Sequence, residues 1–505
     1  MPSENQTPFK NRWLIEGKLV TCSPFHLGDG NEIPWAHFQG ERDEIPLIKS
    51  IFRDVRGLPC IPGSSLKGAL RAAIEDFGQH EKAVEAIFGR QASEDHEGEG
   101  GSAEFHDCRV PEQFAAPPFK HPPPWWDALR LSGIESGIAI DRCTRTVEQS
   151  KLFYFEVVPP GVEFTVRISA QNLEPKQIGL LLGLLDRFSV SNAKPDSAKA
   201  LTLGAGTAGG KGLFRWQLGH VRYLDRSDVA QWIKQPLPAY EATKPWPGGA
   251  DSLKILAPLT QPGTQPAPLV IHLELKFQAF LVNDPSQWKE GTDAPNHTPL
   301  LSDDKRPLLP ESTFRGALRS QAERILRTLA VEGADPAAVG ELKQPSGPLS
   351  KDLGPENFSG VPLAGIIFGT TGWKSPVTLS DSTAIAFDGI PRQEFVGIDR
   401  FSGGSALSMK FNADYALNPT FHVPISVCLE KWETAGIRQA AEGLFALVLR
   451  DLMEGDVTFG FGASKGYGIC RARITNPEGV DWFSKAQPQV DSLRQYLRNG
   501  SMKQK

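Results

Sequence analysis

The sequence contains little cysteine and no long apolar run. Its six cysteines include no C-x-x-C pair, so they fit neither a disulfide framework nor a structural zinc site. His106 and Cys108 come nearest to a pair of metal ligands, and ordinary reduced thiols are the simpler interpretation. The longest apolar run, residues 178–185, is far shorter than the roughly 20 residues of a membrane span. Residues 1–13 do not resemble a signal peptide, and we expect a reducing, cytoplasmic location.

The sequence also lacks an excess of positive charge. Its formal net charge is −5 and its pI is about 6.1, which excludes binding of a polyanion through overall charge but not through a local basic groove. Hydrophobic residues make up 40% of the chain, enough to build buried cores. The length of 505 residues predicts two or three domains.

Four short motifs occur in the same order in both halves of the chain. Residues 61–71, IPGSSLKGALR, return at 309–319 as LPESTFRGALR; IFG at 87–89 returns at 367–369; IDR at 140–142 returns at 398–400; and GAG at 204–206 returns as GFG at 460–462. Three of the four separations are similar, at 248, 258 and 256 positions, and an insertion accounts for the fourth. The chain is therefore predicted to be a tandem duplication.

Each half is predicted to combine strands with two helices. Apolar alternation predicts a first strand at residues 13–22 and again at 269–281. Helices are predicted at 66–77, 174–188, 314–329 and 435–453, and a glycine-rich turn and a strand follow the second helix of each half. This order predicts an α+β, ferredoxin-like fold. The expected organisation is a first domain at 1–235, a Pro-rich linker at 236–268, a second domain at 269–476 and a polar C-terminal tail at 477–505.

The repeated IPGSSLKGALR motif brings hydroxyls and cations to the beginning of a helix. Ser64 and Ser65 are typical N-cap residues, and the peptide N–H groups of a helix start favour an anion. Lys67 and Arg71 are four residues apart and share one helix face. The second copy keeps these residue types as Ser312, Thr313, Arg315 and Arg319. The motif thus predicts a phosphate site in each half, with a capped helix and solvated basic residues as the alternative.

The late glycine-rich stretches have a second polyanion interpretation. Residues 204–209 match the G-x-G-x-x-G pattern of dinucleotide sites, but residues 213–216 predict a strand where that pattern needs a helix. Residues 460–466 break the spacing. We therefore expect a glycine turn that lets backbone approach a polyphosphate chain, with Lys211 or Lys465 beside it. A nucleotide-binding enzyme is the weaker alternative.

At these residues the sequence resembles the RAMP superfamily of CRISPR-associated proteins. The IPGSSLKG block with its following arginine and the late Gly-x-Gly loop with Lys-Gly carry the resemblance. It is most similar to the backbone subunits of type III effector complexes, here two of them fused as in the type III-D branch. The resemblance implies tandem RNA-recognition-motif-like RAMP domains with inserted thumb hairpins, a role in antiviral defence, and three partners: CRISPR RNA, complementary target RNA and other CRISPR-associated effector subunits.

The resemblance also implies an endoribonuclease with one catalytic aspartate per active domain. That residue lies between the first strand and the Ser-Ser block and supports metal-dependent cleavage, with Mg²⁺ as the expected ion. Asp43 and Asp293 fit best, as catalytic residues and metal ligands, because they are 250 positions apart and each precedes a proline turn. The rival acids are Glu44 and Asp29 in the first half and Asp284 and Asp303 in the second.

Thumb hairpins are predicted around the two Ile-Asp-Arg motifs, at 136–159 and 395–421. In the family such hairpins interrupt the guide–target duplex at regular intervals. The cations expected to contact RNA there are Arg142, Arg145 and Lys151 in the first hairpin and Arg400 in the second. Phe153 and Phe155 could wedge between bases, but a place in the core is the favoured interpretation for these two.

Two alternatives stay within the superfamily. One is a structural subunit that only binds guide RNA and spaces its neighbours. The other is a metal-independent endonuclease that processes the guide RNA by histidine acid–base catalysis, for which His26, His37 and His297 are the nearby candidates.

Overall fold

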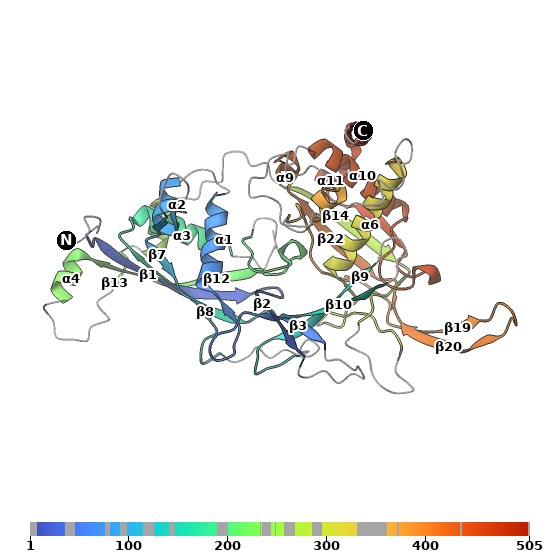
Figure 1. The fold of residues 1–505 in the computed structure, drawn as a ribbon, viewed down its shortest axis with the longest axis horizontal. Helices are drawn as coiled ribbons and strands as arrows, with labels where there is room; N and C mark the ends of the chain where they lie inside the picture. The colour runs from blue at the N-terminus through green and yellow to red at the C-terminus, as the bar shows by residue number, and fades with distance from the viewer. Residues whose placement is uncertain are drawn as a thin grey trace. The chain divides into compact units, whose positions relative to one another are not determined.

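The structure is a computed structural model that divides into two compact units, the first built mainly from described residues up to 256 and the second mainly from those from 268 onward (Figure 1). It describes residues 8–35, 46–75, 81–90, 98–114, 126–140, 147–188, 200–232, 234, 244–247, 249–256, 268–284, 295–302, 304–330, 361–370, 373–434 and 437–502. Among these residues, no helix is long and apolar enough to cross a membrane.

The first unit is built on an antiparallel sheet in which β1 (Asn11–Thr21) lies between β11 (Glu163–Gln171) and β12 (Phe214–Asp225). On the far side of β11, β8 (Cys108–Arg109) continues the sheet. In sequence, α1 (Gly63–Glu75) precedes β8, and α3 (Pro175–Asp186) connects β11 to β12. The strand order β12-β1-β11-β8 with two crossing helices is the ferredoxin-like arrangement. Figure 1 shows α1 and α3 on the same face of this sheet.

The second unit repeats that topology. β14 (Leu269–Phe277) lies between β22 (Thr420–Val427) and β23 (Cys470–Ile474), and β17 (Val377–Thr378) pairs with the outer side of β22. The helices α6 (Glu311–Ala330) and α10 (Arg438–Glu454) take the places of α1 and α3. The predicted duplication and the predicted α+β class are therefore confirmed, and the predicted strand starts and helix starts lie within three residues of the observed ones.

The cores follow from the periodicity of the strands and helices. Along β14, alternate residues from Leu269 to Phe277 are buried while His272 and Lys276 point to the other side. The buried residues of β14 pack against the apolar face of α10, in which Leu444 and Leu449 are fully buried. The first unit has an equivalent core between β1, β11, α1 and α3.

Shorter elements complete the two units. In the first unit they are β4 (Cys60–Ile61), α2 (Glu81–Phe88), β5 (Gly89–Arg90), β6 (Glu99–Gly100), β7 (Ala103–Phe105), α4 (Arg226–Trp232) and β13 (Lys244–Pro245). In the second unit they are β15 (Ala279–Phe280), β16 (Leu308–Leu309), α8 (Leu363–Phe368), β18 (Ser382–Thr383), β21 (Ala416–Leu417) and α9 (Leu429–Thr434).

Each unit carries a β-hairpin at a predicted thumb position. In the first unit, β9 (Gly133–Ile140) pairs with β10 (Val147–Val157). β10 also pairs with β3 (Leu47–Ile51), which in turn pairs with β2 (Gly28–Pro34), so the four strands form one sheet. In the second unit, β19 (Arg392–Ile398) and β20 (Ser405–Asp414) form a separate hairpin. Figure 1 shows this hairpin extending away from the body of the second unit.

Parts of the predicted linker and of the predicted tail pack onto the two units. Within the predicted linker, β13 pairs with β12, and α5 (Gly249–Leu256) packs on α3 with Leu253 fully buried. Gly179 of α3 makes this contact feasible, because an added Cβ would overlap the Leu253 carbonyl oxygen. The predicted tail forms α11 (Pro477–Ser484) and α12 (Gln487–Met502), with Leu493 buried in the second core.

Candidate nucleic-acid interface

The repeated motif begins a helix in both units, but its hydroxyls do not cap it. Helix α1 begins at Gly63, so Ser64 and Ser65 lie within its first turn. The N–H groups of Ser65 and Leu66 donate to the Pro62 carbonyl at 2.9 and 3.2 Å. The predicted N-cap role of the two serines is therefore wrong, because the chain already becomes helical after Pro62, as proline before a first turn favours.

An aspartate from a distant strand accepts the first N–H of each motif helix. Asp107, next to β8, accepts from Gly63 N at 3.0 Å, and Asp381, next to β18, accepts from Glu311 N at 2.8 Å. A negatively charged carboxylate at the N-terminus of a helix also interacts favourably with the helix dipole. Sequence reasoning missed both residues, whose shared position is directly before the short strands β8 and β18.

One face of each motif helix is exposed and uncrowded. Ser64 and Gly68 are exposed on α1, as are Ser312 and Gly316 on α6. Among the described residues, the N–H groups of Ser64 and Ser312 donate to no acceptor. A Cβ added at Gly68 or Gly316 would meet nothing within 4 Å, and neither glycine has a positive φ. The fold itself therefore does not require glycine at these positions.

The motif cations differ between the two copies. Lys67 is half-buried and has no ion pair among the described residues. Its counterpart Arg315 pairs with Glu311 and donates to Ser375 Oγ at 2.8 Å and to the Val377 carbonyl at 3.1 Å. Arg319 is similarly held, by Glu323 at 3.2 Å and the Gly369 carbonyl at 2.8 Å, and Arg71 also has a partner. RNA contact by these arginines stays a prediction, and the geometry supports it best for Lys67.

The glycine-rich loops are the most closely matching backbone segments of the two units. Gly204, Gly206, Gly210 and Gly212 have positive φ, and so do Gly460, Gly462, Gly466 and Gly468, each 256 positions later. Leu203 N donates to Gly212 O, and Phe459 N donates to Gly468 O, both at 3.0 Å. The expected glycine turn is present in both units. The full G-x-G-x3-G-x-G spacing was the sequence signal for this match, and it was overlooked.

The two loop lysines are not equivalent. In this register Lys211 corresponds to Tyr467, and Lys465 corresponds to Gly209. Lys211 forms an ion pair with Glu135 and lies 4.5 Å from the centre of the Phe155 ring. Lys465 is exposed and lies near three rings. Each unit therefore has a lysine in its glycine loop, but the two lysines occupy different positions of the loop.

Most of the predicted catalytic residues lie in loop segments outside the described residues. Asp43 and Glu44 in the first loop and Asp293 and Asp303 in the second lie outside the described residues. The first loop is closed at its neck, where Trp35 N donates to Pro46 O at 2.9 Å.

The described rival acids have structural partners. Asp29 accepts from Ser50 Oγ at 2.6 Å and from Asn31 N at 2.9 Å. Burial would raise the pKa of Asp29, but the hydrogen bonds from Ser50 and Asn31 lower it below its usual value. Asp284 is 7% exposed, its N–H donates to Thr298 O at 2.9 Å, and its place matches that of Asp29.

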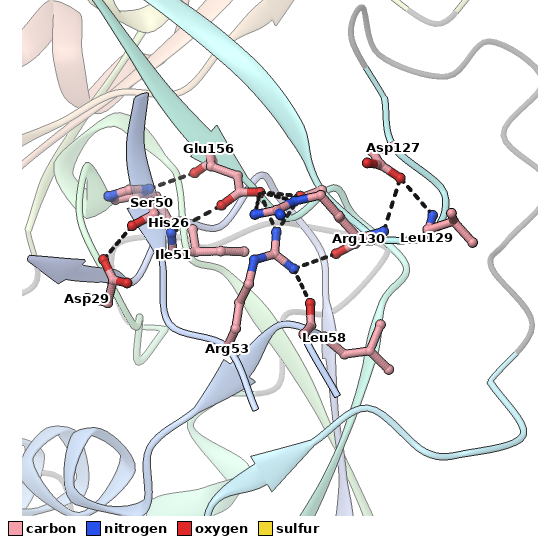
Figure 2. Close-up of polar contacts among 12 residues, drawn as sticks. His26, Asp29, Ser50, Ile51, Arg53, Leu58, Asp127, Leu129, Arg130 and Glu156 are labelled. Carbon is pink, nitrogen blue, oxygen red and sulfur yellow. Dashed lines mark hydrogen bonds and ion pairs between the residues drawn. The ribbon is translucent and has the colours of Figure 1, made fainter. Parts of the chain in front are cut away.

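A buried carboxylate fastens the strands beside the first loop. Figure 2 shows Glu156 of β10 at the centre of this network, with Arg53 and Arg130 on it. The Glu156 carboxylate accepts hydrogen bonds from Ser132 Oγ at 2.6 Å and from Ile51 N at 3.3 Å. The backbone carbonyl of Glu156 contacts His26 Nδ1 at 2.6 Å. Burial would raise the pKa of Glu156, but the Ser132 hydrogen bond and the two guanidinium groups lower it.

The tip of the second hairpin presents a cation and an aromatic ring. Asp399 closes the turn by accepting from Phe401 N at 3.1 Å and from Ser402 Oγ at 2.7 Å. Arg400 is exposed, and Phe401 is 100% exposed. In the first hairpin, Arg142 and Arg145 lie outside the described residues, and only the backbone of Lys151 is described, in β10.

The aromatic residues of the first hairpin differ from expectation. Tyr154 is buried, packed on Trp35 at 5.1 Å between ring centroids, whereas Phe153 is 44% exposed. The core interpretation is therefore wrong for Phe153. The strand pairing with β3 turns Tyr154 inward and its neighbours outward.

Metal ligands do not gather at these surfaces within the described part of the chain. The one group of three acids there, Asp451, Glu454 and Asp456, lies at the end of α10. Burial raises the pKa of Cys108 to about 12, so this residue is a protonated thiol beside His106. Whether the predicted aspartates fit Mg²⁺ depends on loop residues outside the described ranges.

The fold and surfaces together define a tandem RNA-recognition-like module whose two copies each carry a glycine loop, an exposed helix face and a hairpin. The family model of the RAMP superfamily matches residues 18–215 and 242–471. The chain belongs to the RAMP superfamily, and it is accordingly a CRISPR-associated RNA-binding subunit. A comparison with curated proteins found no match.

Proposed function

We propose that this protein is a fused backbone subunit of a type III CRISPR effector complex, most similar to the type III-D branch. It binds CRISPR RNA, and it cleaves the complementary target RNA with an aspartate in each repeat. The other effector subunits are its protein partners.

The exposed glycines of the motif helices carry the RNA-binding part of this proposal. A glycine inside a helix costs about 1 kcal/mol relative to alanine. Gly68 and Gly316 carry that cost although no neighbouring atom in the described part of the chain requires it. A ligand that approaches the helix closely explains the absent side chain. The adjoining N–H and hydroxyl groups of Ser64 and Ser312 can donate to phosphate oxygens, and Lys67 adds a positive charge in the first repeat.

If RNA approaches these glycines, replacing them by alanine should stabilise the protein but weaken its binding of RNA. G68A and G316A should each raise the free energy of unfolding by up to about 1 kcal/mol, since alanine is the better helix former. The same variants should weaken binding of a CRISPR RNA, because the added methyl group separates the RNA from the helix. Denaturant titration and fluorescence anisotropy measure the two effects. Unchanged RNA affinity in G68A/G316A would remove the helix face from the interface.

Cleavage would proceed by attack of a ribose 2′-hydroxyl on the adjacent phosphorus. Asp43 and Asp293 are proposed to assist removal of that proton and to hold a divalent ion, which when bound stabilises charge on the phosphate oxygens. The thumb hairpin supports this chemistry by displacing one nucleotide, because a regular duplex forbids the in-line geometry.

Substitution of both aspartates separates the catalytic proposal from a purely structural subunit. In the assembled complex, D43A/D293A should bind guide and target RNA as the unmodified protein does and should abolish target cleavage. The mapped products of a labelled target RNA provide the measurement. Cleavage at the original sites with the original rate would contradict the catalytic assignment and favour the structural alternative. Guide-RNA processing that survives a strong chelator would favour the processing endonuclease.

A further inference from the structure

An aromatic cluster in the second repeat surrounds a lysine that has no acidic partner. The ring cluster consists of Phe395 of β19, Phe411 of β20, Phe461 of the glycine loop and His297. Lys465 Nζ lies 5.9, 5.5 and 5.6 Å from the centres of the three phenylalanine rings. Among the described residues, no carboxylate pairs with Lys465. Contacts of this kind stabilise a cation but leave its charge uncompensated.

The rings form stacked, half-buried surfaces. Phe395 and Phe411 stack with a centroid distance of 4.9 Å and an interplanar angle of 17°. His297 lies 4.2 Å from Phe461, and its Nδ1 is buried with no hydrogen-bond partner among the described atoms. Burial, and secondarily the charge of Lys465, lowers the pKa of His297. The imidazole is therefore neutral at neutral pH and behaves as one more aromatic ring.

The first repeat builds this place from other residues: Phe153 stacks on Phe155 at 6.1 Å between ring centroids, and Lys49 Nζ lies 6.0 Å from the centre of the Phe153 ring. At the positions that correspond to Phe395, Phe461 and Lys465 it has Gly137, Ala205 and Gly209. Phe153 corresponds to Phe411 and lies directly against Gly137.

The charge around the loop differs in the same direction. The ion pair of Lys211 with Glu135 in the first repeat is replaced by a hydrogen bond from the Tyr467 hydroxyl to Gln393 in the second. Burial raises the pKa of Tyr467 to about 12, so this pair is uncharged. The nearest hairpin carboxylate, Glu394, alternates to the other side of β19 and pairs with Lys410 at 3.4 Å. Glu394 is therefore directed away from the ring side of the second hairpin and is paired there.

We propose that the ring cluster and Lys465 bind one unpaired nucleotide of the bound RNA, with its base stacked on the rings and its phosphate on the ammonium group. Stacking of a base on an aromatic side chain contributes roughly 1–3 kcal/mol and accepts any base. This inference rests on the proposed RNA-binding function and assigns the nucleotide site to the second repeat, where one lysine lies near three phenylalanine rings.

The test uses the full-length protein and a single-stranded RNA oligonucleotide measured by fluorescence anisotropy at several salt concentrations. K465M keeps the apolar stem over the rings and removes the charge. It should weaken binding by about tenfold and reduce the slope of log K against log salt by about one. F395L should weaken binding without changing that slope. K18M and K485M are the controls, because both lysines pair with a carboxylate at the surface outside the proposed interface, and they should change affinity by less than twofold.

Cross-linking gives an independent readout. RNA that contains 4-thiouridine should cross-link to peptides that carry Phe395, Phe411 or Phe461, and F395L should reduce that yield. Binding and cross-linking by K465M and F395L at the level of the unmodified protein would overturn the nucleotide site while leaving RNA binding by the motif helices intact. Absence of RNA binding by the unmodified protein would instead overturn the proposed function itself.

Discussion

Glu156 shows how one buried carboxylate supports the surface proposed to act on RNA. Its side chain is 6% exposed and compensates Arg53, whose side chain is 14% exposed. The variant E156Q keeps the size of the side chain but removes the carboxylate that both guanidinium groups contact, so the free energy of unfolding should fall by about 3 kcal/mol. Denaturant titration at neutral pH measures this loss. E163Q is the control, because Glu163 pairs with Lys18 at the surface and should contribute less than about 1 kcal/mol.

The same residue predicts a pH dependence. Since the folded-state pKa of Glu156 is lowered, its contribution is fully present above the ordinary carboxyl value of 4.5 and is lost as the pH falls through the folded-state pKa. The stability difference between the unmodified protein and E156Q should therefore shrink below about pH 5. A difference that stays constant down to pH 3 would contradict this assignment.

At the scale of elements, the tip of the β19–β20 hairpin can be changed to test RNA binding without destabilising the fold. Phe401 at its tip is fully exposed, so F401S should leave the free energy of unfolding within about 0.5 kcal/mol of the unmodified value. If the ring wedges between bases of a guide–target duplex, the same variant should weaken binding of that duplex by about tenfold. V480S on α11 is the control for loss of an exposed apolar side chain. Unchanged duplex affinity in F401S would exclude the tip as a wedge.

The two motif helices show that equal sequence patterns need not give equal chemistry. Lys67 lacks an ion pair in the first repeat, whereas Arg315 is held by Glu311 in the second. The glycine loops show the reverse, with Lys211 compensated by Glu135 and Lys465 uncompensated. Of these four cations, the one without an ion pair among the described residues thus lies on the motif helix in the first repeat and in the glycine loop in the second.

At the scale of the molecule, duplication predicts separable activities. If each repeat has its own aspartate, D43A should remove one subset of target cuts and D293A the complementary subset, each at an unchanged rate for the remaining sites. Mapping of the cut positions on one labelled target RNA tests this directly. Loss of all cuts in a single variant would mean that only one repeat is active or that the two act together.

The sequence alone determined the duplication, the α+β class, and the approximate positions of the first strands and principal helices, because these depend on local periodicity and on motifs that recur in order. It also located the glycine turns, since positive φ selects glycine at residues such as Gly204 and Gly460. The incorporation of residues 244–256 and of α12 into the cores was not readable, because composition does not show which apolar side chains find a partner.

Tertiary structure decided which charged groups compensate one another. Asp107 accepts from Gly63 across 44 positions, Arg53 meets Glu156 across 103, and Lys211 meets Glu135 across 76. Such pairs form wherever strand pairing brings distant segments together, and no spacing along the chain announces them. The physical reason is that periodicity is a property of neighbouring residues, whereas charge compensation depends on the position of residues far apart in sequence, and only the folded sheet specifies that position.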